Sequence, residues 1–318
     1  MAKVLVIGAV GQIGTELTVA LRKKFGGQSV IAATRKTAFP EEIAAGGPCE
    51  YFDVLEKEKM KEVVKKHGIE TIYQLASLLS ATGEKNPDAA FDINLLGLKS
   101  SLDVARECKV KKIFWPSSIA AFGPTAPHEG TPQRTVLEPT TMYGVTKVAG
   151  ELLCQYYFRK YGLDIRSVRY PGLISYKAEP GGGATDYSVA IFYEAIKNRS
   201  YRCFVGPQTV LPMMYMPDAI RGTIELMGAP SERLTVRTSY NLAAISFSAM
   251  ELADEVARLI PGFTCSYEHD SRQQIADSWP KSIDDSQARR DWGWKHEYDL
   301  RRMSEDMVKN LKTKLLGQ

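Results

Sequence analysis

The sequence predicts an α/β protein built on a doubly wound parallel sheet, with a smaller region of mixed α/β character. Short apolar runs alternate with helix-period segments through the first half, which is the pattern of consecutive βαβ units. A length of 318 residues suits one large domain with an appendage, and 44% hydrophobic and 25% charged residues are ordinary globular usage. The first region is expected over residues 1–175 and the second over 176–318, with the chain crossing back to the first.

The first half supplies the elements of the large sheet. Residues 4–7 are all apolar and are expected to form a buried strand, and the next helix carries Ile13, Leu17 and Leu21 on one face. The other expected elements are strands at 29–33, 50–52, 71–75, 112–115 and 164–169 and helices at 55–66, 88–108 and 143–161. Right-handed crossovers would bring the carboxyl ends of these strands to one edge of the sheet.

Beyond residue 175 the elements become shorter and less regular. The expected helices are 188–197, 219–227, 248–260 and 300–316, and the expected strands are 201–204, 239–242 and 264–267. The run Pro-Gly-Gly-Gly at 180–183 predicts a flexible loop. We expect this region to bind and cover a substrate.

Composition excludes several classes of function. A formal net charge of +4 is too small to indicate nucleic acid or an anionic membrane as a partner. No apolar run reaches the roughly 18 residues of a membrane span, and the chain opens directly into a strand, so a cytoplasmic protein is expected. Five scattered cysteines and four separated histidines form no C-x-x-C or H-x-x-x-H pair, so neither a disulfide framework nor a metal site is predicted.

The turn after the first expected strand carries Gly8, Gly11 and Gly14, spaced G-x-x-G-x-x-G. Gly8 permits a tight turn, Gly11 leaves room for a pyrophosphate beside the backbone, and Gly14 lets the helix pack close to the strand. The helix that follows would direct its free N–H groups and the positive end of its dipole at the phosphates. Between a first strand and a first helix, this spacing predicts a Rossmann-type dinucleotide site.

The end of the second strand usually carries an acidic side chain that bonds the adenosine ribose of NAD. Thr34, Arg35 and Lys36 stand there instead. Thr34 can form one hydrogen bond, whereas Arg35 and Lys36 either hold the 2′-phosphate of NADP or form a solvated turn. NAD is the expected cofactor, with NADP as the alternative. Asp53 and Val54, just past the third strand, are placed to bond and pack the adenine.

Tyr143 and Lys147 are four residues apart on an expected helix and therefore share one face. A free tyrosine has a pKa of about 10, which makes it a poor base at neutral pH. The neighbouring ammonium and the positive nicotinamide ring are expected to lower this pKa, and Lys147 can also hold the nicotinamide ribose. Ser117 and Ser118 end the preceding strand, where a hydroxyl can bond the substrate oxygen.

Together, the glycine turn, the serine pair and the Tyr-x-x-x-Lys spacing resemble the extended short-chain dehydrogenase/reductase superfamily, which includes the UDP-sugar epimerases. Longer segments resemble the short-chain-type L-threonine 3-dehydrogenases in particular. These segments are residues 78–81, 116–124, 170–174, 180–187, 211–215 and 291–296. The resemblance extends over nearly the whole chain, and the later segments are more specific than the glycine turn.

The resemblance implies oxidation of L-threonine to 2-amino-3-ketobutyrate, with Tyr143 taking the hydroxyl proton while Ser117 and Ser118 position the oxygen. It implies further cofactor contacts from Gln12, Ile13, Leu75, Ala76, Ser77, Asn94, Tyr170, Pro171 and Leu173. It implies a substrate pocket formed by Ser80, Ser118, Tyr143 and Thr185. The chain departs from the family at Thr34, where family members have Asp, and at Ser118, where many have Thr.

Some residues near the expected pocket have two interpretations. Asp186 either pairs with the substrate ammonium or caps the helix that begins near Tyr187. Trp279 either walls the pocket or belongs to the core.

Two other functions remain as alternatives. A UDP-sugar 4-epimerase or dehydratase would use the same Tyr–Lys pair, but it must hold a diphosphate, usually with an arginine in the segment that here reads Leu-Pro-Met-Met-Tyr at 211–215. A non-enzymatic NAD(P) sensor on the same fold commonly lacks the Tyr–Lys pair. The apolar segment favours a small substrate, and the retained pair favours an enzyme.

A homodimer is expected by analogy with the superfamily, in which the helices corresponding to 88–108 and 143–161 pair across a two-fold axis. Leu152, Leu153, Tyr156 and Tyr157 place apolar side chains on more than one face of the second helix. Burial within one subunit would explain these side chains equally well.

Overall fold

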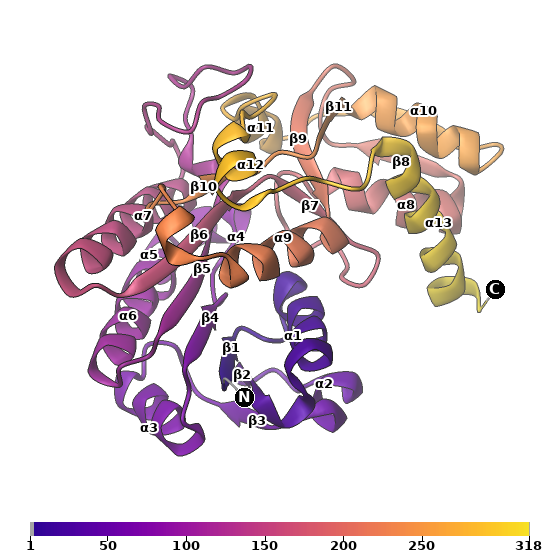
Figure 1. The fold of residues 1–318 in the computed structure, drawn as a ribbon. Helices are drawn as coiled ribbons and strands as arrows, with labels where there is room; N and C mark the ends of the chain where they lie inside the picture. The colour runs from indigo at the N-terminus through magenta and orange to yellow at the C-terminus, as the bar shows by residue number, and fades with distance from the viewer. Residues whose placement is uncertain (1–2, 318) are drawn as a thin grey trace.

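The computed structural model describes residues 3–317, and its centre is a seven-stranded parallel sheet with the order β10-β6-β5-β4-β1-β2-β3 (Figure 1). The strands are β1 (Val4–Ile7), β2 (Val30–Thr34), β3 (Cys49–Tyr51), β4 (Thr71–Gln74), β5 (Lys112–Ser118), β6 (Asp164–Tyr170) and β10 (Tyr240–Asn241). The strand order reverses between β1 and β4, which is where ligands bind in open α/β sheets. The predicted Rossmann-type fold class is confirmed.

Helices cover both faces of this sheet. On one face α3 (Lys57–His67) contacts α6 (Gly97–Glu107), which contacts α7 (Met142–Tyr161). On the other face α1 (Gln12–Phe25) contacts α2 (Glu41–Gly46) and α9 (Met216–Gly228). Each layer closes its own apolar core, because the buried strand residues point alternately to the two faces. No helix in the described part of the chain is long and apolar enough to cross a membrane.

The expected helix 88–108 is interrupted. It consists of α5 (Pro87–Phe91), a π-helical turn over Asp92–Leu96 and α6. Asn94 lies in that turn, and its side chain bonds the backbone of Leu78 in the loop after β4. The extra residue of a π turn thus directs a polar side chain at a neighbouring loop, which apolar periodicity alone does not predict.

The second region packs beside the carboxyl edge of the large sheet. β7 (Gly172–Ile174), β9 (Val210–Tyr215) and β11 (Ile245–Ser248) form one small sheet, and β8 (Ser200–Cys203) pairs with β12 (Thr264–Tyr267). The other elements of this region and of the loop after β4 are α4 (Ser80–Lys85), α8 (Tyr187–Asn198), α10 (Ala249–Leu259), α11 (Arg272–Asp277), α12 (Ser286–Trp292) and α13 (Leu300–Leu316). Strands β7, β9 and β11 are not predicted from the sequence. Strand β7 has only three residues, and β9 contains Pro212, a residue type that is uncommon inside strands.

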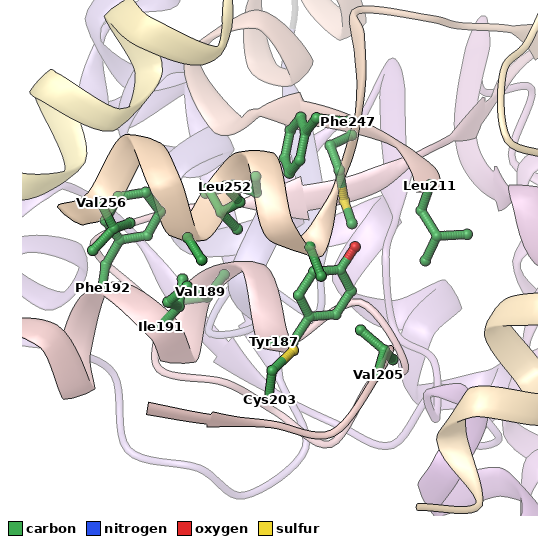
Figure 2. Close-up of a cluster of buried hydrophobic side chains, with 14 of the residues drawn as sticks. Tyr187, Val189, Ile191, Phe192, Cys203, Val205, Leu211, Phe247, Leu252 and Val256 are labelled. Atoms are coloured by element: carbon green, nitrogen blue, oxygen red, sulfur yellow. The ribbon is translucent and has the colours of Figure 1, made fainter. Parts of the chain in front are cut away.

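Figure 2 shows the core of this second region, where side chains of α8, α10 and β9 converge on Tyr187. Tyr187 is fully buried, and among the described residues its hydroxyl has no hydrogen-bond partner. A buried hydroxyl without a partner loses its bonds to water on folding and gains nothing in return.

Tyr187→Phe should therefore raise the free energy of unfolding by about 1 kcal/mol, measured by urea denaturation. Tyr240→Phe is the matched control, because the buried Tyr240 hydroxyl donates a hydrogen bond to Asp291 at 2.6 Å. Loss of this bond should lower the free energy of unfolding by about 1–3 kcal/mol. Equal destabilisation of both variants would contradict this interpretation of Tyr187.

Candidate active site

The glycine turn between β1 and α1 forms a cradle at the carboxyl edge of the sheet. Gly8 adopts a φ of +83°, and a Cβ there would lie 2.8 Å from the backbone nitrogen of Ala76. A Cβ on Gly14 would collide with the carbonyl of Gly8. Helix α1 starts after Gly11 with no side-chain cap and no acidic residue in its first turn. Its free N–H groups and uncovered backbone fit a dinucleotide diphosphate.

The ends of β2 and β3 continue this edge. Thr34 is the last residue of β2 and is buried, whereas Arg35 is more than half exposed and its guanidinium lies 3.6 Å from the carboxylate of Asp53. Val54 is buried, and its side chain fills the space that a Cβ on Gly97 would occupy. The residues predicted to contact the adenosine end of the cofactor thus form one surface at the ends of β2 and β3. The polar groups of this surface are Thr34 and the Arg35–Asp53 pair.

The loop after β4 is held from behind by Asn94. The Asn94 amide oxygen accepts from the Ser77 hydroxyl at 3.0 Å and from the Leu78 N–H at 2.7 Å. The Asn94 amide nitrogen donates to Thr146 on α7 at 3.3 Å. Asn94 is 2% exposed and does not line the cleft, and its bonds hold this loop against α7, so the cofactor contact expected of it stays a prediction.

Between the two regions lies a cleft of about 810 Å³, counting its open mouth. The predicted residues that line it are Gln12, Ile13, Leu75, Ser77, Ser80, Ser117, Ser118, Tyr143, Lys147, Tyr170, Pro171, Leu173 and Thr185. Asp186 and Trp279 line it as well, so Trp279 belongs both to the pocket wall and to the core. The structure thus brings the expected nicotinamide and substrate residues into one cavity.

Tyr143 and Lys147 are positioned by the first turns of α7. Thr141 caps this helix, and its hydroxyl accepts from the Gly144 N–H at 3.1 Å. The Lys147 ammonium donates to the carbonyl of Pro116 at 2.7 Å and lies 5.1 Å from the centre of the Tyr143 ring. The Ser118 hydroxyl is within hydrogen-bonding reach of the Tyr143 phenol. Tyr, Lys and Ser therefore meet at one wall of the cleft.

Burial governs the acidity of both groups. Burial raises the pKa of Tyr143 to about 12, and the hydrogen bond from Ser118 opposes this rise. Burial lowers the pKa of Lys147 to about 7, and the negative charge of Glu151 opposes that fall. Desolvation therefore favours the neutral phenol in the protein alone, and the lowering of this pKa by the ammonium together with a bound nicotinamide ring stays a prediction.

Neighbouring residues on a strand point to opposite sides, and this separates the two serines. Ser118 faces Tyr143, and its Oγ accepts from the Ala120 N–H at 3.2 Å. The hydroxyl of Ser117 is 2% exposed and donates to the carboxylate of Glu151 at 2.6 Å. The expectation that Ser117 positions the substrate oxygen is therefore corrected: its hydroxyl serves a buried network behind the cleft.

That network centres on an ion pair that sequence reasoning missed. Arg169 on β6 grips both carboxylate oxygens of Glu151, at 2.8 and 2.6 Å, and both side chains are at most 4% exposed. Arg169 also donates to Asn241 on β10 at 3.0 Å. The available signal was the spacing of Glu151, one helical turn after Lys147 on α7. The network fixes α7 to β5, β6 and β10 directly beneath Lys147.

The substrate side of the cleft is formed by α4 and the loop before α8. Ser80 begins α4 and is buried, and Thr185 packs so closely on Gly172 that a Cβ there would lie 2.8 Å from its methyl group. Asp186 accepts from the N–H groups of Gly182 and Gly183 at 2.6 and 2.8 Å. Asp186 precedes α8 without capping it, and its carboxylate instead holds the glycine loop.

Two further observations define the chemistry of the cleft. Its only lining residues with charged side chains are Lys147 and Asp186, and no arginine lines it. The Tyr170 hydroxyl points away from the cleft and bonds Thr223 on α9. Tyr170 therefore lines the cleft with its backbone and the inner part of its ring, and not with its hydroxyl. No group of three or more His, Cys, Asp or Glu within the described residues is arranged to hold a metal ion.

The chain matches the model of the NAD-dependent epimerase/dehydratase family over residues 4–243 and belongs to that family. The family and the threonine dehydrogenase relatives indicate a nicotinamide-dependent oxidoreductase. The chain is 48% identical over 299 residues to the mitochondrial L-threonine 3-dehydrogenase of Sus scrofa, which covers 94% of this chain and 79% of the relative. These findings confirm the resemblance predicted from the motifs.

Solved structures agree with this placement. The structure of L-threonine dehydrogenase from Clostridium difficile is 48% identical, has a TM-score of 0.96, and matches 99% of this chain and 98% of its own. A monomeric L-threonine 3-dehydrogenase from a metagenome is 47% identical, has a TM-score of 0.94, and matches 98% of this chain and 99% of its own.

Proposed function

We propose that the protein oxidises L-threonine at its 3-hydroxyl, producing 2-amino-3-ketobutyrate, reduced NAD and one proton. The observation that carries the proposal is the meeting of Tyr143, Ser118 and Lys147 at one wall of a small cleft without arginine. The relatives named above as L-threonine dehydrogenases support it. A nucleotide sugar would require a cation for its diphosphate, which the residues lining this cleft do not supply beyond Lys147.

In this proposal each residue of the wall has a distinct task. Tyr143 accepts the proton of the 3-hydroxyl, and Ser118, whose Oγ already accepts from Ala120, donates its own hydrogen to the substrate oxygen. Glu151 raises the pKa of Lys147 and so favours the ammonium, which in turn favours the phenolate. The glycine turn of Gly8, Gly11 and Gly14 would hold the dinucleotide, which would supply the hydride acceptor for C3 of the substrate. Ser80 and Thr185 bind the amino acid end of the substrate.

A paired substrate assay tests the proposal. With L-threonine and NAD, the absorbance band of reduced nicotinamide should grow at a rate that saturates with threonine. UDP-galactose, supplied in parallel, should be neither epimerised nor oxidised. Turnover of UDP-galactose without turnover of threonine would replace this proposal with the epimerase alternative.

We propose NAD as the cofactor and infer that Arg35 also admits NADP, because Thr34 carries no charge that would repel a 2′-phosphate. The Arg35–Asp53 pair is loose at 3.6 Å and exposed, so the guanidinium is free to turn toward a phosphate. Arg35→Ala should weaken NADP binding roughly tenfold or more and change NAD binding little, measured by fluorescence titration of both reduced cofactors. An equal loss for both cofactors would reject this role.

We also propose that the enzyme forms a homodimer through α5, α6 and α7. Large apolar side chains on α5, the π turn that follows it and α7 are each at least 40% exposed, namely Phe91, Leu96, Val145, Leu152 and Tyr156. A second copy of the same face would cover them, as isologous interfaces do. Sedimentation of the protein at twice the monomer mass supports the proposal, and a monomer at micromolar concentration contradicts it.

The two regions of the chain have different proposed roles. We propose that residues 1–175 bind the cofactor and that residues 176–318 cover the substrate, with β10 crossing back to the large sheet. We place the enzyme in the cytoplasm, where its five free cysteines would remain reduced.

A further inference from the structure

A second cavity lies beside the second half of α7 and shares no lining residue with the cleft. It is formed by the loop before α7, the outer half of α7, β6 and the loop before β10. It encloses about 780 Å³, counting its open mouth. The lining residues are Gln133, Arg134, Thr135, Gln155, Arg159, Arg169, Thr235, Val236, Arg237 and Thr238. Four arginines thus surround one cavity, and no acidic residue lines it.

Two of these arginines already have a carboxylate partner, although Arg237 shares Asp164 with Arg166. Arg169 is clamped to Glu151 at 2.6 Å, and Arg237 pairs with Asp164 at 2.9 Å while its guanidinium stacks on Phe158 at 4.2 Å. Each is held rigidly at the floor of the cavity by partners that lie outside it.

The other two arginines are not neutralised. In the single chain the side chains of Arg134 and Arg159 are exposed at the mouth, and within the described residues neither side chain takes part in a hydrogen bond or ion pair. The cavity therefore carries an excess of two positive charges. Gln155 and Thr238 add uncharged polar side chains to its wall, whereas the Gln133 amide and the Thr235 hydroxyl already bond within the protein.

We propose that this cavity binds a small anion that carries a diphosphate group, either free or attached to a nucleoside. Two unpaired guanidiniums match two phosphate groups, because each guanidinium fork binds phosphate oxygens in a bidentate manner. The volume falls within the range of small-molecule sites. Neither the glycine cradle nor the cleft shares a lining residue with this site, so the cavity can be filled while the dinucleotide is bound.

Calorimetric titration tests the proposal with the whole protein. NAD is kept at saturation so that the glycine cradle is already filled, and inorganic pyrophosphate or ADP is then titrated at low ionic strength. Saturable binding of pyrophosphate is expected. Tighter binding of ADP would identify a nucleoside-linked ligand, and equal or weaker binding would identify the free anion. The absence of saturable binding of both would overturn the proposal.

A pair of double variants locates the binding. Arg134→Gln/Arg159→Gln should weaken it at least about tenfold, because both unpaired cations are removed. Arg202→Gln/Arg301→Gln is the matched control, since it removes the same charge from exposed arginines that pair elsewhere with Glu268 and Glu305. Unfolding temperatures confirm that both variants remain folded. Unchanged binding in the first variant, or equal loss in the control, would show that the cavity is not the site.

Discussion

Tyr143→Phe should lower kcat for threonine oxidation by about 10²-fold or more while leaving the fold intact. The substitution removes only the phenol oxygen, which is the one group of the wall that can take the proton of the 3-hydroxyl in this arrangement. Because burial raises the pKa of Tyr143 to about 12, the wild-type rate should also increase with pH through the alkaline range. The variant should lose that increase. Steady-state rates measured from pH 6 to 10 check both effects.

Tyr161→Phe provides the control, since Tyr161 is an exposed tyrosine at the far end of the same helix. Its variant should keep the wild-type rate and pH profile. Near-normal turnover of Tyr143→Phe would remove Tyr143 from the proposed role. A loss of rate with an unchanged pH profile would assign the proton transfer to another group.

Arg169→Met should lower the free energy of unfolding by about 3–5 kcal/mol, because it leaves the carboxylate of Glu151 buried without its cation. Glu151 is 1% exposed, and apart from Arg169 it accepts only from Ser117 among its described contacts. The double variant Glu151→Met/Arg169→Met should recover most of the loss, since neither partner of the pair is then buried without the other. Urea denaturation of the single and double variants measures both values.

The exposed pair Arg202–Glu268 sets the scale for comparison. Removing either partner there should change stability by at most about 1 kcal/mol, because solvent screens both charges. If Arg169→Met were no more destabilising than Arg202→Met, the buried network could not be what fixes α7 beneath the cleft.

The parts of the site that could be predicted from the sequence are those set by local spacing. The glycine turn is decided by contacts within one βα unit: Gly8 needs a positive φ, and Gly14 leaves no room for a side chain beside the Gly8 carbonyl. Tyr143 and Lys147 share a helix face at any i, i+4 spacing. The parallel sheet likewise followed from the alternation of strands and helices.

The parts that could not be predicted depend on contacts between distant segments. The partner of Ser117 is Glu151 on α7, and the partner of Glu151 is Arg169 on β6, so no local pattern distinguishes Ser117 from Ser118. The direction of the Tyr143 pKa shift depends on how many segments bury the phenol. The π turn at Asn94 and strand β9 with Pro212 likewise owe their shapes to neighbouring loops and strands.

Transfer of isotope from the substrate carbon tests the central claim most directly. The protein is incubated with NAD and L-threonine that carries deuterium at C3, and the reduced cofactor is examined by mass spectrometry and NMR. The account predicts that deuterium appears at C4 of the nicotinamide and that the labelled substrate reacts no faster than the unlabelled one. Reduced cofactor without deuterium, or no reduction at all, would contradict the account.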